Sequence, residues 1–286
     1  MTSRRIVAEA FIAACRDELD APKPGNVHVF APGHRMTVAQ FVDSAAAAAG
    51  PLCAPGARVG ARIRGAVDAT TKTVGANTNL GIVLLCAPLA AAAELGALEL
   101  RRAVARVLDD LDVADAADAF AAIVQASPAG LGRAERHDVS GPAQVTLKHA
   151  MAEAADRDRV ARQYATAFAD VFDLGMRLHA AAATRWSDAK WATLAVYLGF
   201  LSKFPDSHII RKHGAEVAAD VQRTGMNFDA LLRAAQEPAD LLGKLLAWDA
   251  ALKARGINPG TTADLTVATL FGRRLQSVLP SGRNSG

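Results

Sequence analysis

Apolar residues recur along this chain at intervals of three and four positions, in segments separated by clusters of proline, glycine and polar residues. This interval is typical of amphipathic helices, and no run alternates between apolar and polar residues for long enough to form a strand. The pattern therefore predicts an all-α protein. Its helices are expected over Ser3–Leu19, Thr37–Ala49, Ala57–Val74, Asn79–Leu95, Leu98–Leu111, Ala114–Gln125, Ala143–Phe172, Asp188–Lys203, Ser207–Arg223, Phe228–Gln236, Pro238–Arg255 and Thr261–Leu279.

The segment Asn79–Leu95 is apolar on almost every face. Such a helix is surrounded by other helices, so we expect it at the centre of a multi-helix bundle. The long segment Ala143–Phe172 places Asp158 and Arg162 four positions apart, where they are expected to pair on its exposed face. No shift in composition marks a domain boundary. We predict one all-α domain over 1–279 and a disordered tail over 280–286.

Composition supports the helical prediction. The chain of 286 residues is rich in alanine, the best helix former, and only 5% of its residues are aromatic. Hydrophobic residues make up 51% and charged residues 21%, with a formal net charge of +3. This balance is not typical of a disordered chain or of a nucleic-acid-binding surface.

The sequence also bears on location and partners. Cys15, Cys53 and Cys86 form no CxxC pair, which fits a reducing cytosol. Met1–Arg16 lacks the pattern of a signal peptide, and the apolar run Leu80–Ala93 is shorter than the ~18 to 20 residues of a membrane span. We expect a cytoplasmic protein that binds neither membrane nor nucleic acid. An apolar bundle of this size is typical of a symmetric homodimer.

Polar segments rich in glycine or proline interrupt the apolar background, and each lies at or just before the start of a helix. Free backbone N–H groups and the positive end of the helix dipole make such positions natural anion sites. Several of them converging in one bundle would hold a polyphosphate. The segments are Pro22–His28, Gly75–Gly81, Phe204–Gly214 and Asn258–Asp264.

Several polar residues in these segments also have an ordinary explanation as helix caps. Asn77 or Thr78 is a suitable N-cap for the central helix, and Asp206 is one for the helix that follows it. Thr261 and Asp264 have the spacing of a capping box, with aspartate in place of the usual glutamate. Capping and ligand binding both remain open for these residues.

Basic residues offer candidate phosphate ligands. Lys23 lies between Pro22 and Pro24, and a stiff turn that holds a basic side chain serves no evident packing purpose, so we expect it to bind phosphate. Lys72 either complements a helix dipole at a C-terminus or reaches the space around Asn77.

The chain lacks several well-known site motifs. His28, His34, His208 and His213 are not at zinc-binding spacing. The absence of a Walker loop, a GxGxxG turn and a GxSxG elbow excludes P-loop kinases, Rossmann dehydrogenases and α/β-hydrolases. The residues alone thus predict a helical bundle with a polar pocket for an anionic ligand, with a divalent ion held by Asp206 and Asp264 as one way to bind it.

Together, the polar segments resemble those of the triphosphoribosyl-dephospho-CoA synthase family, which makes the prosthetic-group precursor of citrate lyase and malonate decarboxylase. The correspondence runs from about Glu18 to Phe271. The matching residues are Lys23-Pro24-Gly25, the serine–alanine helix at Phe41–Ala45, Asn77-Thr78-Asn79-Leu80-Gly81, Asp206 with Arg211, Lys212 and Gly214, and Gly260-Thr261-Thr262-Ala263-Asp264-Leu265.

The resemblance implies a reaction in which the ribose 2′-hydroxyl of dephospho-CoA displaces adenine from C1′ of ATP. Asp206 and Asp264 are then expected to bind Mg²⁺ or to stabilise the sugar cation. His28 or His208 is expected to transfer the proton. Asp138 is a further candidate metal ligand, although aspartate in a loop often serves a turn. Phosphate and nucleotide binding are assigned to Lys23, Gly25, Lys72, Asn77, Thr78, Arg211, Lys212, Thr261 and Thr262.

One departure from the family pattern concerns the acceptor. Asn79-Leu80 stands where the citrate-lyase enzymes have histidine–lysine. This variant, with Gly130-Leu131-Gly132 and Asp138-Val139, is similar to a branch found with one-carbon carriers of the tetrahydromethanopterin and methanofuran type. Three hypotheses follow: an ATP-dependent triphosphoribosyl transferase, a biosynthetic enzyme for such a carrier on the same scaffold, and a non-catalytic nucleotide-binding helical protein.

Overall fold

The structure is a computed structural model that describes residues 4–278 apart from 35, 97–98, 128–131 and 133–135. The described residues form helices joined by loops, and their only β-type pairing consists of the isolated bridges His28–Ala31 and Gly33–Met36. The all-α prediction is therefore confirmed. The predicted tail over 280–286 and the residues Gly130-Leu131 lie outside the described residues.

The α-helices follow one another as a bundle, with a π-helical segment η1 (Asp170–Gly175) and a 3₁₀ segment η2 (Pro238–Leu241) between them. They are α1 (Arg4–Leu19), α2 (Val38–Leu52), α3 (Val59–Val74), α4 (Leu80–Ala93), α5 (Leu100–Asp109), α6 (Val113–Ala126), α7 (Leu147–Ala154), α8 (Arg159–Ala165), α9 (Met176–Arg185), α10 (Ala189–Lys203), α11 (Ser207–His213), α12 (Ala215–Ala234), α13 (Leu242–Ala254) and α14 (Gly260–Val278).

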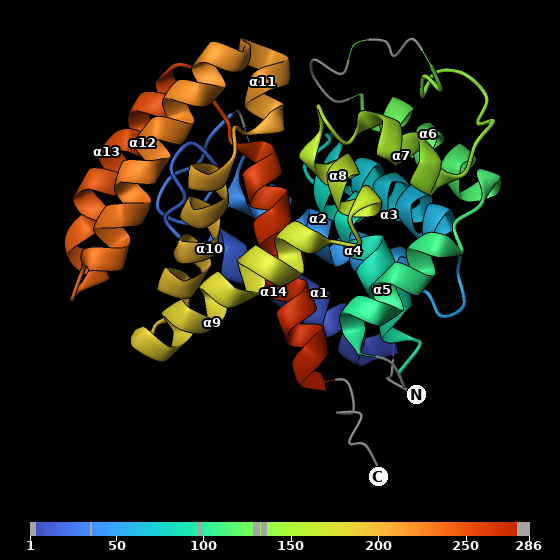
Figure 1. Cartoon of the computed structure of the whole chain (residues 1–286), viewed down its shortest axis with the longest axis horizontal. Coiled ribbons are helices and arrows are strands. Elements are labelled where there is room, and N and C mark those ends of the chain that lie inside the picture. Colours follow the sequence, from blue (N-terminus) through green and yellow to red (C-terminus); the bar gives the residue numbers. More distant parts are fainter. Residues whose placement is uncertain (1–3, 35, 97–98, 128–131, 133–135, 279–286) are drawn as a thin grey trace.

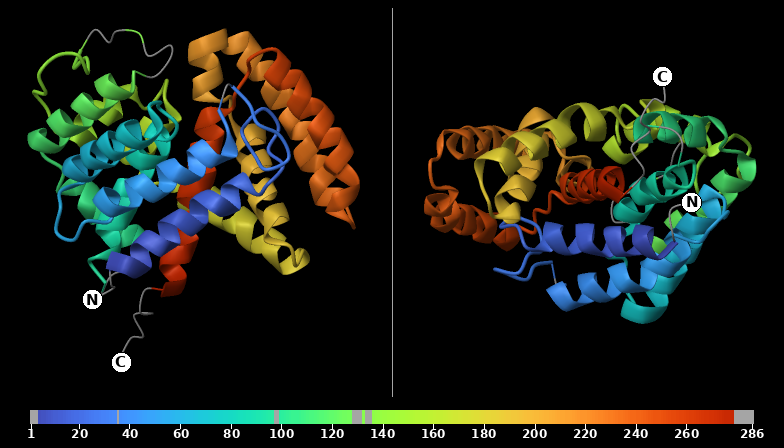
Figure 2. Two further views of the ribbon diagram at one scale, coloured as in Figure 1. Left: turned by 180° about the vertical axis from the view of Figure 1, so that it is seen from behind. Right: turned by 90° about the horizontal axis from the view of Figure 1, so that it is seen from below.

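Helix α14 runs through the middle of the molecule, with α2 to α8 on one side and α10 to α13 on the other (Figures 1 and 2). The buried apolar side chains form two clusters, a larger one around α4 and a smaller one among α10, α12 and α13. Helices α10 and α14 contribute residues to both clusters. The position of α14 between them places its N-terminal turn where the two halves meet.

The prediction of a buried apolar helix is confirmed by α4. All of its residues except Gly81 and Ala91 are buried. It packs against α14, α3 and α5, so neighbours cover it on several sides as its composition requires. No helix in the described part of the chain has the length and apolarity needed to cross a bilayer.

The prediction of one long helix over 143–172 is wrong. Asp158 caps the N-terminus of α8 in an extended conformation, and its carboxylate accepts hydrogen bonds from the N–H groups of Val160 and Ala161. Ala167 and Phe168 then take left-handed backbone conformations that end the helical run. The other carboxylate oxygen of Asp158 pairs with Arg211 of α11, so the expected surface pair with Arg162 is also wrong.

The break predicted between Arg223 and Phe228 is wrong as well. Gly214, at φ +90°, separates α11 from α12, because a left-handed residue cannot continue an α-helix. Helix α12 then continues to Ala234 without the expected interruption. Gly225 lies inside it, where an added Cβ would be 3.1 Å from Cγ of Leu201. This glycine serves the close approach of α12 to α10 and does not end a helix.

Candidate active site

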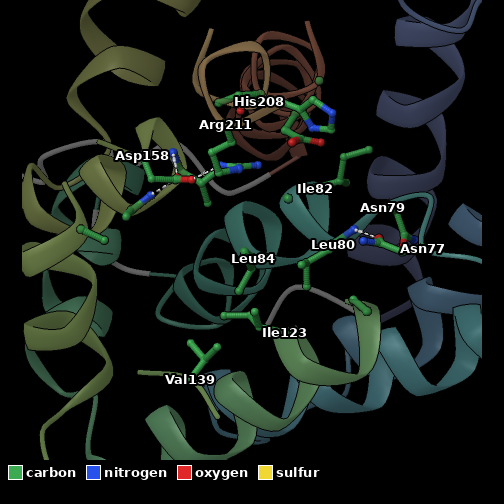
Figure 3. A pocket seen from close by; sticks show the side chains of 18 of the residues that line it. Asn77, Asn79, Leu80, Ile82, Leu84, Ile123, Val139, Asp158, His208 and Arg211 are labelled. Carbon is green, nitrogen blue, oxygen red and sulfur yellow. Dashed lines mark hydrogen bonds and ion pairs between the residues drawn. The ribbon is translucent and has the colours of Figure 1, made fainter. Parts of the chain in front are cut away.

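A cavity of about 680 Å³ lies between the first turns of α4, α11 and α14 and the helices α6, α7 and α8. Its lining differs from end to end (Figure 3). His208, Arg211 and Asp158 lie together at one end, whereas Leu84 and Ile123 lie at the other. A ligand with a charged part and an apolar part fits such a lining.

Asp264, in the second turn of α14, is a candidate for the chemistry of the site. Its carboxylate lines the cavity, and no hydrogen bond to it is found among the described residues. Burial raises the pKa of this carboxyl group well above its ordinary value, and the nearby carboxylates of Asp206 and Glu18 raise it further. A carboxylate without partners in a cavity is set up to receive a cation or a proton.

Glu18 is a cavity residue that the sequence analysis did not assign to the site. It lies at the end of α1 and is buried. The ammonium group of Lys23 donates to Glu18, to Oδ1 of Asn26 at 3.0 Å and to the carbonyl oxygen of Val27 at 2.8 Å. Burial raises the pKa of Glu18, and the Lys23 charge opposes that rise. A glutamate five positions before the lysine of the Pro-Lys-Pro turn is the sequence signal that would have identified it.

Lys23, which was predicted to bind phosphate, is buried and does not line the cavity. Its three ammonium protons are matched by its three acceptors, so in this structure it holds Glu18 and the loop. This gives the stiff basic turn a structural purpose.

Gly25 joins the first and the last polar segments. Its φ of +82° is a left-handed conformation, and an added Cβ would lie 2.8 Å from Cδ of Pro259. Beside it, Nδ2 of Asn26 donates to Oδ1 of Asn258 at 2.8 Å. Both asparagines line the cavity. Gly25 itself does not, so it brings the two segments together without facing the ligand space.

Asp206 caps two helices. Its Oδ1 accepts hydrogen bonds from the N–H groups of His208 and Ile209, at 2.9 and 3.1 Å, at the start of α11. Its Oδ2 accepts from N and Oγ1 of Thr262, both at 2.7 Å. The carboxylate is buried and does not line the cavity. The structure thus favours capping as the role of Asp206. The expected Thr261–Asp264 capping box does not form, since α14 already begins at Gly260.

The two candidate histidines differ in position. His28, at the end of the polar segment Pro22–His28, is fully buried, with Nε2 3.3 Å from Oδ1 of Asp249. It does not line the cavity. His208 does line it. Burial, with the positive charges of Arg211 and Lys212, lowers the pKa of His208 to about 4. Its imidazole is therefore neutral at physiological pH.

The predicted phosphate ligands fall into two groups. Arg211 and Lys212 line the cavity. One guanidinium nitrogen of Arg211 pairs with Asp158, while its Nε is buried without a partner. Lys72 is exposed in the last turn of α3 and does not line the cavity, which favours its helix-dipole explanation.

The central polar segment lines the cavity with Asn77, Thr78 and Asn79. The N-cap of α4 is Asn79, not Asn77 or Thr78. The side chain of Asn77 still contributes, because its Oδ1 accepts from the N–H of Leu80 at 3.2 Å (Figure 3). Oγ1 of Thr78 lies 2.5 Å from Oγ of Ser44, so this threonine is tied to α2.

The three carboxylates predicted as metal ligands have different surroundings. Asp206 is occupied by helix N-termini, and Asp264 faces the cavity from α14. Asp138 lines the cavity from the loop before α7, where its Oδ1 accepts from N and Oγ of Ser140, at 2.9 and 2.5 Å. That pattern is the turn that loop aspartates commonly form.

Substitution of Gly81 tests whether activity depends on the position of the Asp264 carboxylate. A Cβ added at Gly81 would lie 2.0 Å from Oδ2 of Asp264, so Gly81→Ala must displace that carboxylate. We expect catalytic turnover at this site to fall at least about 100-fold, since a displacement of roughly 1 Å at a reacting centre has that effect. Gly243→Ala, where a Cβ meets nothing within 4 Å, is the matched control and should retain full activity. Equal activity in both variants would remove Asp264 from the reaction.

Fold and cavity together define an all-α protein whose ligand site joins carboxylates, cations and helix N-termini to an apolar wall. A family model for ATP:dephospho-CoA triphosphoribosyl transferase (CitG) matches residues 4–282. The chain therefore belongs to that family of transferases, whose substrates are ATP and dephospho-CoA. This confirms the family resemblance seen in the sequence.

The fold is similar to that of a solved structure. This is a crystal structure from Archaeoglobus fulgidus described as that of a proposed triphosphoribosyl-dephospho-CoA synthase. The TM-score is 0.63 at 23% sequence identity, over 84% of this chain and 99% of that one. No curated protein matches the sequence.

Proposed function

We propose that this protein displaces adenine from C1′ of ATP with the ribose 2′-hydroxyl of dephospho-CoA, so that the triphosphate stays on the transferred ribose. The observation that carries this proposal is the unpartnered carboxylate of Asp264 in the cavity. As the bond to adenine breaks, positive charge develops at C1′. A fixed carboxylate beside that carbon stabilises the charge in the transition state more than in the ground state.

The cations of α11 bind the triphosphate in this proposal. Arg211 and Lys212 line the cavity, and the N-terminal turn of α4 faces the same space with its N–H groups and dipole. Binding of a polyanion there offsets the positive charges that lower the pKa of His208. His208 then becomes a better base for the hydroxyl proton of the acceptor.

A magnesium ion fits the donor set at the same end of the cavity. Glu18 and Asp264 both line it, and carboxylate oxygens together with phosphate oxygens are the ligands that Mg²⁺ prefers. Such an ion would neutralise triphosphate charge and orient the chain of phosphates. At the other end, Leu84, Ile123 and Met151 offer apolar contacts for the pantetheine arm of dephospho-CoA.

The raised pKa of Asp264 predicts the pH dependence of the reaction. Because the reaction needs the ionised carboxylate, kcat/KM should fall as pH drops through the pKa of Asp264. That pKa is raised, so the acid limb should lie well above the ordinary aspartate value of about 3.9. Rates measured from pH 4 to 9 test this. A limb near the His208 pKa of about 4 would instead assign the titrating base to His208.

The decisive experiment is chromatography of the protein incubated with ATP, Mg²⁺ and dephospho-CoA. The proposal requires free adenine and a CoA derivative that is heavier by a triphosphoribosyl group. If ATP raises the melting temperature but no adenine appears with dephospho-CoA, one-carbon carrier intermediates are the next acceptors to supply. Adenine release with one of these would establish the biosynthetic alternative, and binding without turnover of any acceptor would establish a nucleotide-binding protein.

A further inference from the structure

A group of side chains that could hold a metal ion lies on α7 and in the loop before it, and none of its members has been given a role above. His149 and Glu153 are one turn apart on α7, and His137 precedes the helix. The ligand atoms of the three residues all lie within 4.8 Å of one another. No other such group is found in the part of the chain that the structure describes.

The spacing of these atoms is close to that of a metal site. Oε1 of Glu153 lies 3.7 Å from Nε2 of His137 and 3.5 Å from Nε2 of His149. Ligands bound at about 2.0–2.2 Å in a tetrahedron are about 3.3–3.6 Å apart. The carboxylate oxygen therefore already lies at about the spacing that two ligands of one zinc ion have, from each of the two imidazole nitrogens. Small side-chain rotations would complete the site.

Local structure explains why the three side chains meet. Thr146 caps α7 by accepting a hydrogen bond from the N–H of His149 at 3.3 Å, which starts the helix in the register that puts His149 and Glu153 on one face. His137 has a left-handed backbone, at φ +50°, a conformation that few residues other than glycine adopt. Its imidazole stacks edge-on against that of His149, with ring centroids 5.9 Å apart.

We propose that His137, His149 and Glu153 bind one zinc ion at the wall of the cavity. Two imidazoles and one carboxylate are a donor set of zinc sites that keep a fourth position for water or another ligand. His137 and Glu153 also line the cavity, so the open position is accessible to a ligand there. The inference does not depend on the proposed transfer reaction, because metal binding at this site requires no nucleotide.

Arg136 and the cysteines are the groups that could compete with this site, the first for its carboxylate and the others for the metal ion. NH2 of Arg136 lies 3.0 Å from Oε1 of Glu153, so its charge competes with a metal ion for the same oxygen. The free cysteines Cys15, Cys53 and Cys86 are all buried and offer no competing thiolate on the surface. Zinc that binds with high affinity is therefore expected to depend on histidine and carboxylate ligands.

The experiment is a titration of the full-length, tag-free protein with Zn²⁺ in the absence of nucleotide, read by calorimetry and by metal analysis after dialysis. We expect one ion per chain with a dissociation constant in the micromolar range or below. His149→Ala and Glu153→Gln should each weaken binding by about 100-fold or more, because each removes a direct ligand. His179→Ala, an imidazole on α9 outside the group, is the matched control and should leave binding unchanged.

Arg136→Ala distinguishes this site from adventitious surface binding. Removal of the competing guanidinium should tighten zinc binding several-fold, while loss of an unrelated arginine such as Arg223 should not. Co²⁺ in place of Zn²⁺ should give the intense visible bands of a tetrahedral site, and His137→Asn should remove them. Circular dichroism confirms that each variant is folded. Zinc binding that is only millimolar, or that survives His149→Ala unchanged, would overturn the proposal.

Discussion

Asp264→Asn is expected to slow adenine release strongly and to make the folded protein more stable. The amide keeps the shape of the side chain but carries no charge, so the developing cation at C1′ loses its partner, and kcat should fall by roughly 10²–10³-fold. The same change removes a half-buried carboxylate that has no hydrogen-bond partner among the described residues. We expect a gain of about 1–3 kcal/mol in the free energy of unfolding at pH 8, or about 2–6 °C in Tm.

The sign of the stability effect follows from the direction of the pKa shift. The folded-state pKa of Asp264 is raised, so wild-type protein loses stability as pH rises through that pKa, where the half-buried group must ionise. The Tm difference between variant and wild type should thus be largest at pH 8 and shrink toward pH 4. Differential scanning calorimetry at several pH values measures this.

Asp43→Asn is the matched control, because Asp43 is exposed on α2. It should change neither activity nor Tm beyond small surface effects. An Asp264→Asn variant that keeps activity within about threefold would contradict the proposed role, since a carboxylate that stabilises the transition state contributes several kcal/mol.

Asp206→Ala is expected to lower the free energy of unfolding by about 3 kcal/mol or more. The buried carboxylate accepts hydrogen bonds from both α11 and α14, and alanine leaves those donors unsatisfied away from water. Urea unfolding measures the change. Activity should fall at the same time, because Asp206 positions His208 and the first turn of α14 without touching the cavity.

Asp112→Ala provides the comparison. Asp112 is also an N-cap, of α6, but it is solvent-exposed, so its loss should cost only about 1 kcal/mol. Asp206→Asn, which keeps one carbonyl oxygen as an acceptor, should restore part of the stability and activity. If Asp206→Ala unfolded like the wild type and was still inactive, Asp206 would act in catalysis directly, as the sequence first suggested.

Sequence and structure agree where the signal is local. The apolar composition of Leu80–Ala93 predicts the buried helix α4, and the proline–glycine turn after Leu19 correctly ends α1. Helix breaks that depend on distant contacts were not predictable in this way. Asp158 ends a helical run because Arg211, 53 positions away, and the N-terminus of α8 bind its carboxylate.

The site shows the same division. The order of the polar segments indicates an anion site and the family, and it selects Asp264, His208, Arg211 and Lys212, which all line the cavity. It does not separate these residues from Lys23 and Asp206, which hold the cavity's framework. Nor does it find Glu18 or the group formed by His137, His149 and Glu153.

The sequence by itself determined the helical class, the buried helix and the segments that carry the chemistry, because helical period, capping and turns depend on residues a few positions apart. Only the tertiary structure decided which polar side chains face the ligand space and which hold helices together. Asp206 and Asp264 are similar in their sequence context. In the structure, Asp206 accepts hydrogen bonds from the N-termini of two helices, whereas Asp264 lines the cavity without a hydrogen-bond partner among the described residues. That difference arises from packing between segments far apart in the chain, where the burial and partners of each charge are set.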